Sequence, residues 1–153
     1  MNVHQPHLQA LERYPLPLRA RQLAYAGLMP FVLGALLVHL VRADAHPYVV
    51  LSLQAYAALI VSFLGGVYWG VAFRETAPAD HLFMWGVVPS LLAWPAVIMP
   101  GSAGLVLLGV LLLVCYAVDR RYYPRHGMGH WLTLRFRLST VAALSCFLGA
   151  AGT

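Results

Sequence analysis

Residues Tyr56–Gly70 read YAALIVSFLGGVYWG, and this stretch decides the fold. It carries no charged residue, and on a helix at 100° per residue its small and bulky side chains fall on opposite sides. On the small side, a repeat with a period of four residues consists of Ala58, Ser62, Gly66 and Gly70. Small residues at this spacing are typical of helices whose backbones approach closely in a bilayer. The stretch therefore predicts a membrane-spanning helix.

The same projection predicts which face of this helix contacts protein. The bulky side is expected to face lipid and holds Leu53, Ile60, Val61, Leu64, Tyr68 and Val71. The opposite side is expected to pack against other helices, and its main members form what we call the small-residue stripe: Ala58, Ser62, Gly65, Gly66, Trp69 and Gly70. Trp69 is the large side chain of this stripe, so it is expected to fill a packing hole or to line a pocket.

The composition of the chain agrees with a membrane protein. Of its 153 residues, 61% are hydrophobic and 10% are charged, and the mean hydropathy is +0.72. Soluble domains average about 25% charged residues. All ten basic residues are arginines that lie between apolar runs, so no basic run interleaved with aromatic residues forms a nucleic-acid-binding pattern. Nucleic acid is therefore not an expected partner.

Apolar runs predict an all-α bundle of five transmembrane helices. The expected spans are about Gln22–Val41, Tyr48–Phe73, His81–Met99, Ala103–Val118 and Thr133–Ala151. Prolines inside the first and third spans predict kinks. The fourth span is shorter than the roughly 20 residues that a bilayer requires, so we expect either an upright helix or one that draws Asp119 inward. Residues 1–21 are polar and rich in proline, and they are interpreted as a cytoplasmic arm before a transmembrane domain of residues 22–153.

The arginines predict the orientation of the bundle. Nine of them share one side of a five-span topology, and Arg42 alone lies on the other. Loops on the cytoplasmic or matrix side carry such an excess, so the N-terminus is expected inside and the C-terminus outside. The nine are Arg13, Arg19, Arg21, Arg74, Arg120, Arg121, Arg125, Arg135 and Arg137.

A group of charges is expected where the fourth span ends and the fifth begins. This interfacial charge cluster comprises Asp119, Arg120, Arg121, Arg125, Arg135 and Arg137. We expect Asp119 to pair with Arg120, Arg121 or Arg137, as a structural clamp rather than a catalytic group, because perturbed ion pairs mark active sites only statistically. The basic residues of the cluster form a cytoplasmic rim, where each one adds about 1 kcal/mol of attraction to anionic lipid headgroups.

No metal site, cofactor or catalytic residue is predicted. His126 and His130 are four residues apart, but glycines between them favour a loop, and a zinc site needs three or four ligands. His39 lies near the outer end of its span, and no second histidine lies at matching depth to hold a haem. Cys115 and Cys146 are interpreted as small buried hydrophobes. No span carries a charge at mid-depth, so ion-coupled transport is not expected.

Five short blocks of the sequence resemble a known family. They are AGLMPF (Ala26–Phe31), YxAxIVSFLGGxYWG (Tyr56–Gly70), WGVVPSLLAW (Trp85–Trp94), VDRR (Val118–Arg121) and WLTLRFRLS (Trp131–Ser139). Over about Gln22–Ala150 they resemble the domain-of-unknown-function 3429 family of transmembrane protein 69-like proteins. The resemblance implies a small helical protein of bacterial or mitochondrial inner membranes, with no established reaction, cofactor or catalytic residue. The positions that it singles out are Pro30, Ser62, Gly65, Gly66, Trp69, Pro89, Trp94, Asp119, Arg120 and Arg137.

Two functional hypotheses follow from the sequence. The first is an accessory, assembly or scaffold component of an inner-membrane complex, which binds a membrane-protein partner or associates with itself. The second is a membrane protein that binds an apolar small molecule such as a lipid, a quinone or a porphyrin. An enzyme that uses Asp119 and the histidines has less support, because no nucleophile arrangement or zinc-hydrolase motif accompanies them.

Overall fold

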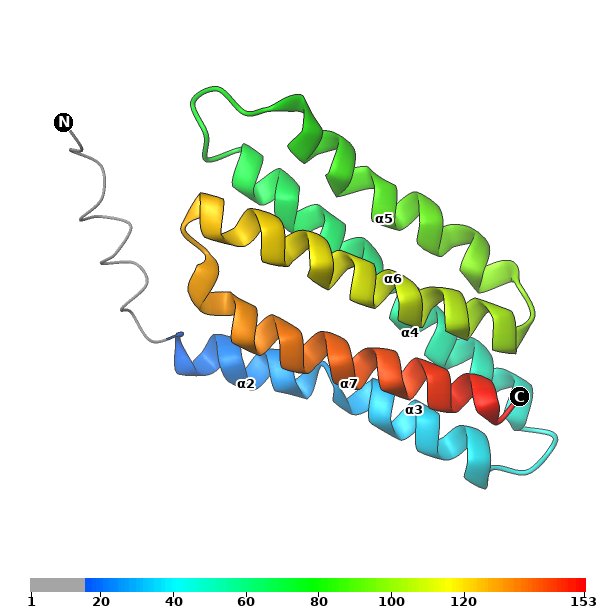
Figure 1. Ribbon diagram of the computed structural model, residues 1–153. Coiled ribbons are helices and arrows are strands. Elements are labelled where there is room, and N and C mark those ends of the chain that lie inside the picture. Colours follow the sequence, from blue (N-terminus) through cyan, green and yellow to red (C-terminus); the bar gives the residue numbers. More distant parts are fainter. Residues whose placement is uncertain (1–15) are drawn as a thin grey trace.

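The computed structural model describes residues 16–153 as a bundle of helices joined by short connections (Figure 1). The helices are α2 (Leu18–Ala26), α3 (Met29–Leu40), α4 (His46–Ala72), α5 (Asp80–Ile98), α6 (Gly101–Tyr122) and α7 (Leu132–Ala151). Two short 3₁₀ turns, η1 (Tyr123–His126) and η2 (Gly129–Trp131), connect α6 to α7. Strands are absent from this part of the chain. Most of the predicted N-terminal arm, including Arg13, lies outside the described residues.

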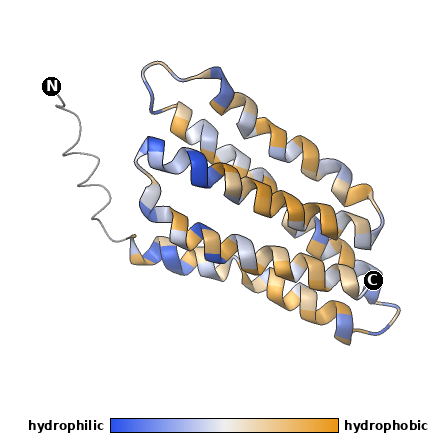
Figure 2. Ribbon diagram, in the orientation of Figure 1, coloured by the Kyte–Doolittle hydropathy of each residue, from blue (hydrophilic) through white to orange (hydrophobic). Residues whose placement is uncertain are grey.

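The prediction of an all-α bundle with five membrane-spanning segments is confirmed. Within residues 16–153, five segments are long and apolar enough to cross a membrane, and α2 with α3 together make the first of them. The orientation across the membrane stays a prediction. Figure 2 shows the hydrophilic residues gathered mainly at the end where α6 ends and α7 begins, with apolar residues along the middle of the helices.

Helix α4 lies at the centre of the bundle and carries the stretch that decides the fold. It packs against α3, α5, α6 and α7. Its buried residues Leu53, Ala57 and Val61 belong to one apolar core. The other helices contribute to that core mainly through leucine and alanine, including Leu105, Leu108, Leu112, Ala142 and Ala143.

Two helix boundaries differ from the expected ones. Helix α6 continues past Val118 to Tyr122, so the fourth span is not short. The predicted span ends at Val118 because the next residue, Asp119, is charged. The helix continues past it because no helix-breaking residue occurs before Pro124. Asp119 therefore lies within the helix, with its side chain buried in the bundle. Helix α2 begins at Leu18, within the segment that the sequence predicts to be the arm.

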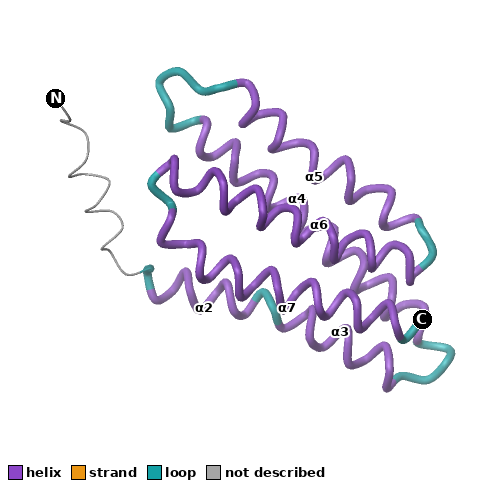
Figure 3. The backbone as a smooth tube through the Cα atoms, viewed as in Figure 1, coloured by secondary structure: helices purple, strands orange, loops and turns teal. Residues whose placement is uncertain are grey.

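The first span is broken where proline predicted a kink. Helix α2 ends at Ala26 and α3 begins at Met29, so Pro30 lies in the first turn of α3, where its missing N–H leaves no helical bond unmade (Figure 3). The phenol of Tyr56 on α4 donates a hydrogen bond of 2.8 Å to the carbonyl of Gly27 in the break. The central helix thereby fixes the interruption.

A buried glutamine of α4 likewise satisfies backbone carbonyls, here at the end of α5. The Gln54 amide donates to the carbonyls of Ala96, at 3.1 Å, and Met99, at 3.3 Å. The helical partner of the Ala96 carbonyl would be the N–H of residue 100, which is a proline and has none. In a bilayer no water is present to replace that bond, so the Gln54 side chain supplies it.

The assignment of the two faces of α4 is wrong in large part. Leu53, Val61, Leu64 and Tyr68 of the expected lipid side are buried in the bundle. Gly66 and Gly70 of the small-residue stripe are exposed, and a Cβ on either would meet no atom within 4 Å. The projection separates two faces but does not say which one meets lipid, because lipid tails and a protein core are equally apolar.

The stripe packs closely at one position, against α5. A Cβ on Gly65 would lie 2.7 Å from the carbonyl oxygen of Gly86, and the indole of Trp69 fills the space that Gly86 leaves open. Trp69 also donates through Nε1 to the carbonyl of Phe83 at 3.0 Å. Trp69 therefore fills a packing hole, one of its two expected roles. Ala58 is buried too, whereas Ser62 is only partly covered.

Two neighbouring glycines provide a matched test of this helix contact. We expect Gly65→Ala to lower stability by about 1–3 kcal/mol, because the new methyl group meets the backbone of α5. Gly66→Ala should be neutral or stabilising by up to about 1 kcal/mol, because its methyl group enters open space and alanine favours a helix. Thermal unfolding in the same detergent measures both. A larger loss for Gly66→Ala would contradict the observed packing.

Candidate functional site

A buried ion pair joins three helices at the arginine-rich end of the bundle. Asp119 of α6 is 1% exposed and Arg135 of α7 is 9% exposed. Arg135 donates from Nε, at 2.8 Å, and from Nη2 to the Asp119 Oδ2 oxygen. The phenol of Tyr68 on α4 donates to Oδ1 at 2.8 Å. Both carboxylate oxygens are thus satisfied, and the pair carries no net charge.

The connection between α6 and α7 brings these two side chains together. Asp119 lies in the last turn of α6 and Arg135 in the first turn of α7, with η1 and η2 between them. Gly127, with a φ of 70°, turns the chain after η1, in a conformation that glycine adopts without strain. Tyr123 of η1 is buried beside the pair and packs near Tyr68, with ring centroids 6.4 Å apart.

The pairing inside the interfacial charge cluster differs from the expected one. Asp119 binds Arg135, not Arg120, Arg121 or Arg137, all three of which are exposed. Arg137 follows Arg135 by two positions, about 200° around a helix, and so points to the opposite side. There its Nη1 atom lies 3.5 Å from the Tyr25 hydroxyl. Arg125 is exposed as well and lies over the Tyr122 ring, 5.8 Å from its centroid.

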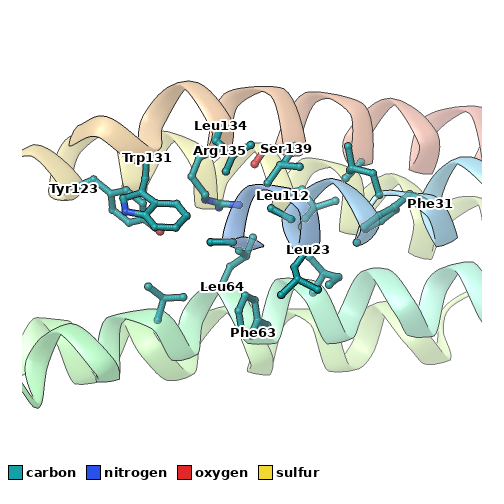
Figure 4. A pocket seen from close by; sticks show the side chains of 18 of the residues that line it. Leu23, Phe31, Phe63, Leu64, Leu112, Tyr123, Trp131, Leu134, Arg135 and Ser139 are labelled. Carbon is teal, nitrogen blue, oxygen red and sulfur yellow. The ribbon is translucent and has the colours of Figure 1, made fainter. Parts of the chain in front are cut away.

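An apolar pocket of about 550 Å³ lies beside this ion pair. Its walls come from α2, α3, α4, α6 and α7, with η1, η2 and the turn between them closing one end. Figure 4 shows Leu64, Leu112, Phe31 and Trp131 around the cavity, with Arg135 reaching toward it from α7. Carbon atoms therefore dominate the surface that an occupant would contact.

Two polar residues of α7 stand on the wall of this pocket, Arg135 and Ser139. Ser139 is 2% exposed, and its Oγ atom has no hydrogen-bond partner among the described residues. The two are four positions apart, so they lie on the same face of the helix. The sequence places both polar residues on one face of a helix, but it does not show that this face lines a cavity.

The pocket opens between α2 and α4. Leu23 of α2 and Phe63 of α4 both line it, yet they are 73% and 67% exposed. Helix α2 buries none of its residues and packs mainly against α7. In a membrane, exposed apolar side chains such as these two face the lipid tails. An apolar molecule therefore has a direct route from the bilayer.

None of the histidines among residues 16–153 lines this pocket. His126 pairs through Nδ1 with Glu75 at 2.7 Å, and the His130 ring lies tilted beside the Trp131 ring, with centroids 5.9 Å apart. His39 hydrogen-bonds through Nε2 to the carbonyl of Leu148 at 3.0 Å, near the opposite end of the bundle. Over residues 16–153, no three metal-binding side chains are grouped closely enough to hold an ion.

Comparison with known proteins identifies relatives over most of the chain. The family described as protein of unknown function (DUF3429) matches residues 16–151. Transmembrane protein 69 of Xenopus tropicalis is 35% identical over 150 residues, which cover 94% of this chain and 56% of that protein. Transmembrane protein 69 of Mus musculus is 24% identical over 135 residues, which cover 86% and 55%. The chain thus spans a little over half the length of these relatives. No solved structure matches it significantly.

The ion pair is tested by two arginines of the same helix. We expect Arg135→Met to lower stability by about 3–5 kcal/mol, because it leaves the buried Asp119 carboxylate without its counter-ion. Arg137→Met should change stability by less than about 0.5 kcal/mol, because that side chain is exposed. Thermal unfolding in detergent compares them. In the double variant Asp119→Leu with Arg135→Met, much of the stability should return, since no unpaired charge remains. Equal losses for the two single variants would contradict the burial of the pair.

Proposed function

The chain belongs to the family described as protein of unknown function (DUF3429), and we propose that it binds a small apolar molecule inside the membrane. The observation that supports this proposal is the apolar pocket of about 550 Å³ beside the Asp119–Arg135 pair. The expectation of an apolar-ligand protein is thereby preferred over that of a scaffold.

The pocket has the features of a ligand site. Pockets that bind small molecules commonly measure about 300–1,000 Å³ and are lined by apolar side chains with a few polar groups that fix orientation. Here the apolar lining includes Phe31, Leu64 and Trp131, and the polar groups include Arg135 and Ser139. The occupant is expected to be an elongated apolar molecule with one polar end.

The opening between α2 and α4 determines how such a molecule arrives. The exposed side chains at this opening, Leu23 and Phe63, are apolar, so a hydrophobic ligand leaves the bilayer core without crossing water. A water-soluble ligand would have to cross the lipid first. The proposed function is therefore the capture of a membrane-dissolved molecule.

We propose in addition that this multi-pass protein lies in an inner membrane with its N-terminus inside. The asymmetric arginines support this orientation. The pocket would then open in the inner half of the bilayer, because Arg135 and Trp131 on its wall belong to the arginine-rich end.

The exposed arginines favour a second candidate function. In it, the chain is an accessory protein that binds anionic lipid or a membrane partner. Arg120, Arg121 and Arg125 are exposed at the same end of the bundle. If they hold anionic lipid, Arg121→Gln with Arg125→Gln should reduce the anionic lipid that co-purifies in gentle detergent, measured by mass spectrometry. Arg42→Gln at the opposite end is the control. If the double variant co-purifies with as much anionic lipid as the wild type, this candidate function is wrong.

The pocket itself is tested by two alanines of α2. Ala24 lines the pocket, whereas Ala26 is exposed and does not. We expect Ala24→Trp to displace a co-purifying apolar molecule by filling the cavity, and Ala26→Trp to leave it bound. The measurement is extraction of the purified protein followed by quantitative mass spectrometry of small molecules. Because α2 buries no residue, neither change disturbs the core.

The comparison has an outcome that would refute pocket binding. If wild-type protein and both variants yield only bulk phospholipid, in the proportions of the host membrane, the cavity holds no selected ligand. Loss of the molecule from Ala26→Trp as well would mean that it binds elsewhere.

A further inference from the structure

Resting on the proposed function, the polar wall of the pocket points to the chemistry of its ligand. We propose that the ligand carries a neutral carbonyl oxygen, as in an ester or a quinone, which accepts hydrogen bonds from Ser139 and Arg135. Its apolar tail extends along the cavity toward the opening at Leu23 and Phe63 (Figure 4).

The unpartnered hydroxyl of Ser139 is the first argument. Buried hydroxyls are nearly always hydrogen-bonded, and a membrane interior offers no water to supply the missing partner. Ser145 on the same helix shows the usual solution, since its Oγ donates to the Val141 carbonyl at 2.9 Å. The Oγ atom of Ser139 has no such partner among residues 16–153. A ligand atom in the adjoining pocket would provide one.

The second argument comes from the guanidinium of Arg135, which indicates that the ligand atom is a hydrogen-bond acceptor. Nε and Nη2 are engaged by Asp119, and the guanidinium stands on the wall of the pocket. An arginine only donates, whereas a serine hydroxyl either donates or accepts. An acceptor oxygen is therefore the one group that both residues of this wall can bind together.

The charge of the site selects a neutral acceptor. Asp119 already neutralises Arg135 within the bundle. An anionic headgroup would add a third charge without a counter-ion in an apolar surrounding, which costs far more than placing a carbonyl there. The exposed arginines, such as Arg121 and Arg125, are outside the pocket lining and do not offset that charge.

One probe series isolates the polar end of the ligand. Methyl dodecanoate has a neutral carbonyl, dodecanoate has an anion and dodecane has neither, on nearly the same tail. Saturation binding of radiolabelled methyl dodecanoate to the full chain in lipid nanodiscs, with the other two as competitors at slightly alkaline pH, ranks the three. We expect the ester to bind most tightly, with the alkane and the anion each at least several-fold weaker.

Two serine variants assign the contact to a residue. Ser139→Ala should weaken binding of the ester about two- to tenfold, the usual contribution of one hydrogen bond, and leave competition by dodecane unchanged. Because the hydroxyl has no partner in the empty protein, its removal should not lower the thermal midpoint. Ser145→Ala is the control, since Ser145 lies outside the pocket lining and should not affect binding.

The possible results separate this inference from the proposed function. Equal binding of ester and alkane, with no effect of Ser139→Ala, would overturn the carbonyl assignment and leave the apolar pocket in place. Preference for dodecanoate would overturn it in favour of an anion. Absence of saturable binding by all three would overturn both.

Discussion

The salt bridge between Asp119 and Arg135 is the interaction on which the arginine-rich end of the bundle depends. It joins α6 to α7, and the Tyr68 hydrogen bond adds the central helix α4. A buried charge that loses its partner costs several kcal/mol, so removing either residue alone is strongly destabilising. The same pair keeps one face of Arg135 on the wall of the pocket. Stability and the polar character of the pocket thus have a common source.

The requirement that polar groups be satisfied without water explains the other specific contacts of α4. Gln54 bonds carbonyls at the end of α5, Tyr56 bonds the carbonyl in the break between α2 and α3, and Trp69 bonds a carbonyl of α5. Gln54 and Tyr56 meet carbonyls at a helix end or in a helix break, where helical bonding is incomplete. Against this pattern, the buried Ser139 hydroxyl stands out because nothing within the described chain completes it.

The sequence predicted the number of spans and the kink at Pro30, because length, hydropathy and proline chemistry are local properties. It did not predict which side of α4 is buried, since Leu64 and Gly66 are equally compatible with lipid and with protein. Nor did it separate Arg135 from Arg137 as the partner of Asp119, because that choice depends on the rotation of α7. The sequence did not predict the pocket for the same reason. The pocket is a gap in the packing of five helices, and no short segment of sequence determines how those helices pack.

Helix α2 is the element that keeps the pocket from closing. The break at Gly27 and Leu28 detaches it from α3, and α2 buries none of its residues although Leu23 and Ala24 face the cavity. Apolar side chains such as these two gain little by collapsing onto a core in lipid, because lipid solvates them equally well. An open cavity therefore costs little free energy in a membrane, because lipid tails can fill it. Ser139, beside Arg135, adds what lipid tails do not use: a hydroxyl that an occupant with a carbonyl satisfies and a saturated chain leaves unpaired. That difference in hydrogen bonding gives the pocket a physical basis for selecting one molecule from the surrounding membrane.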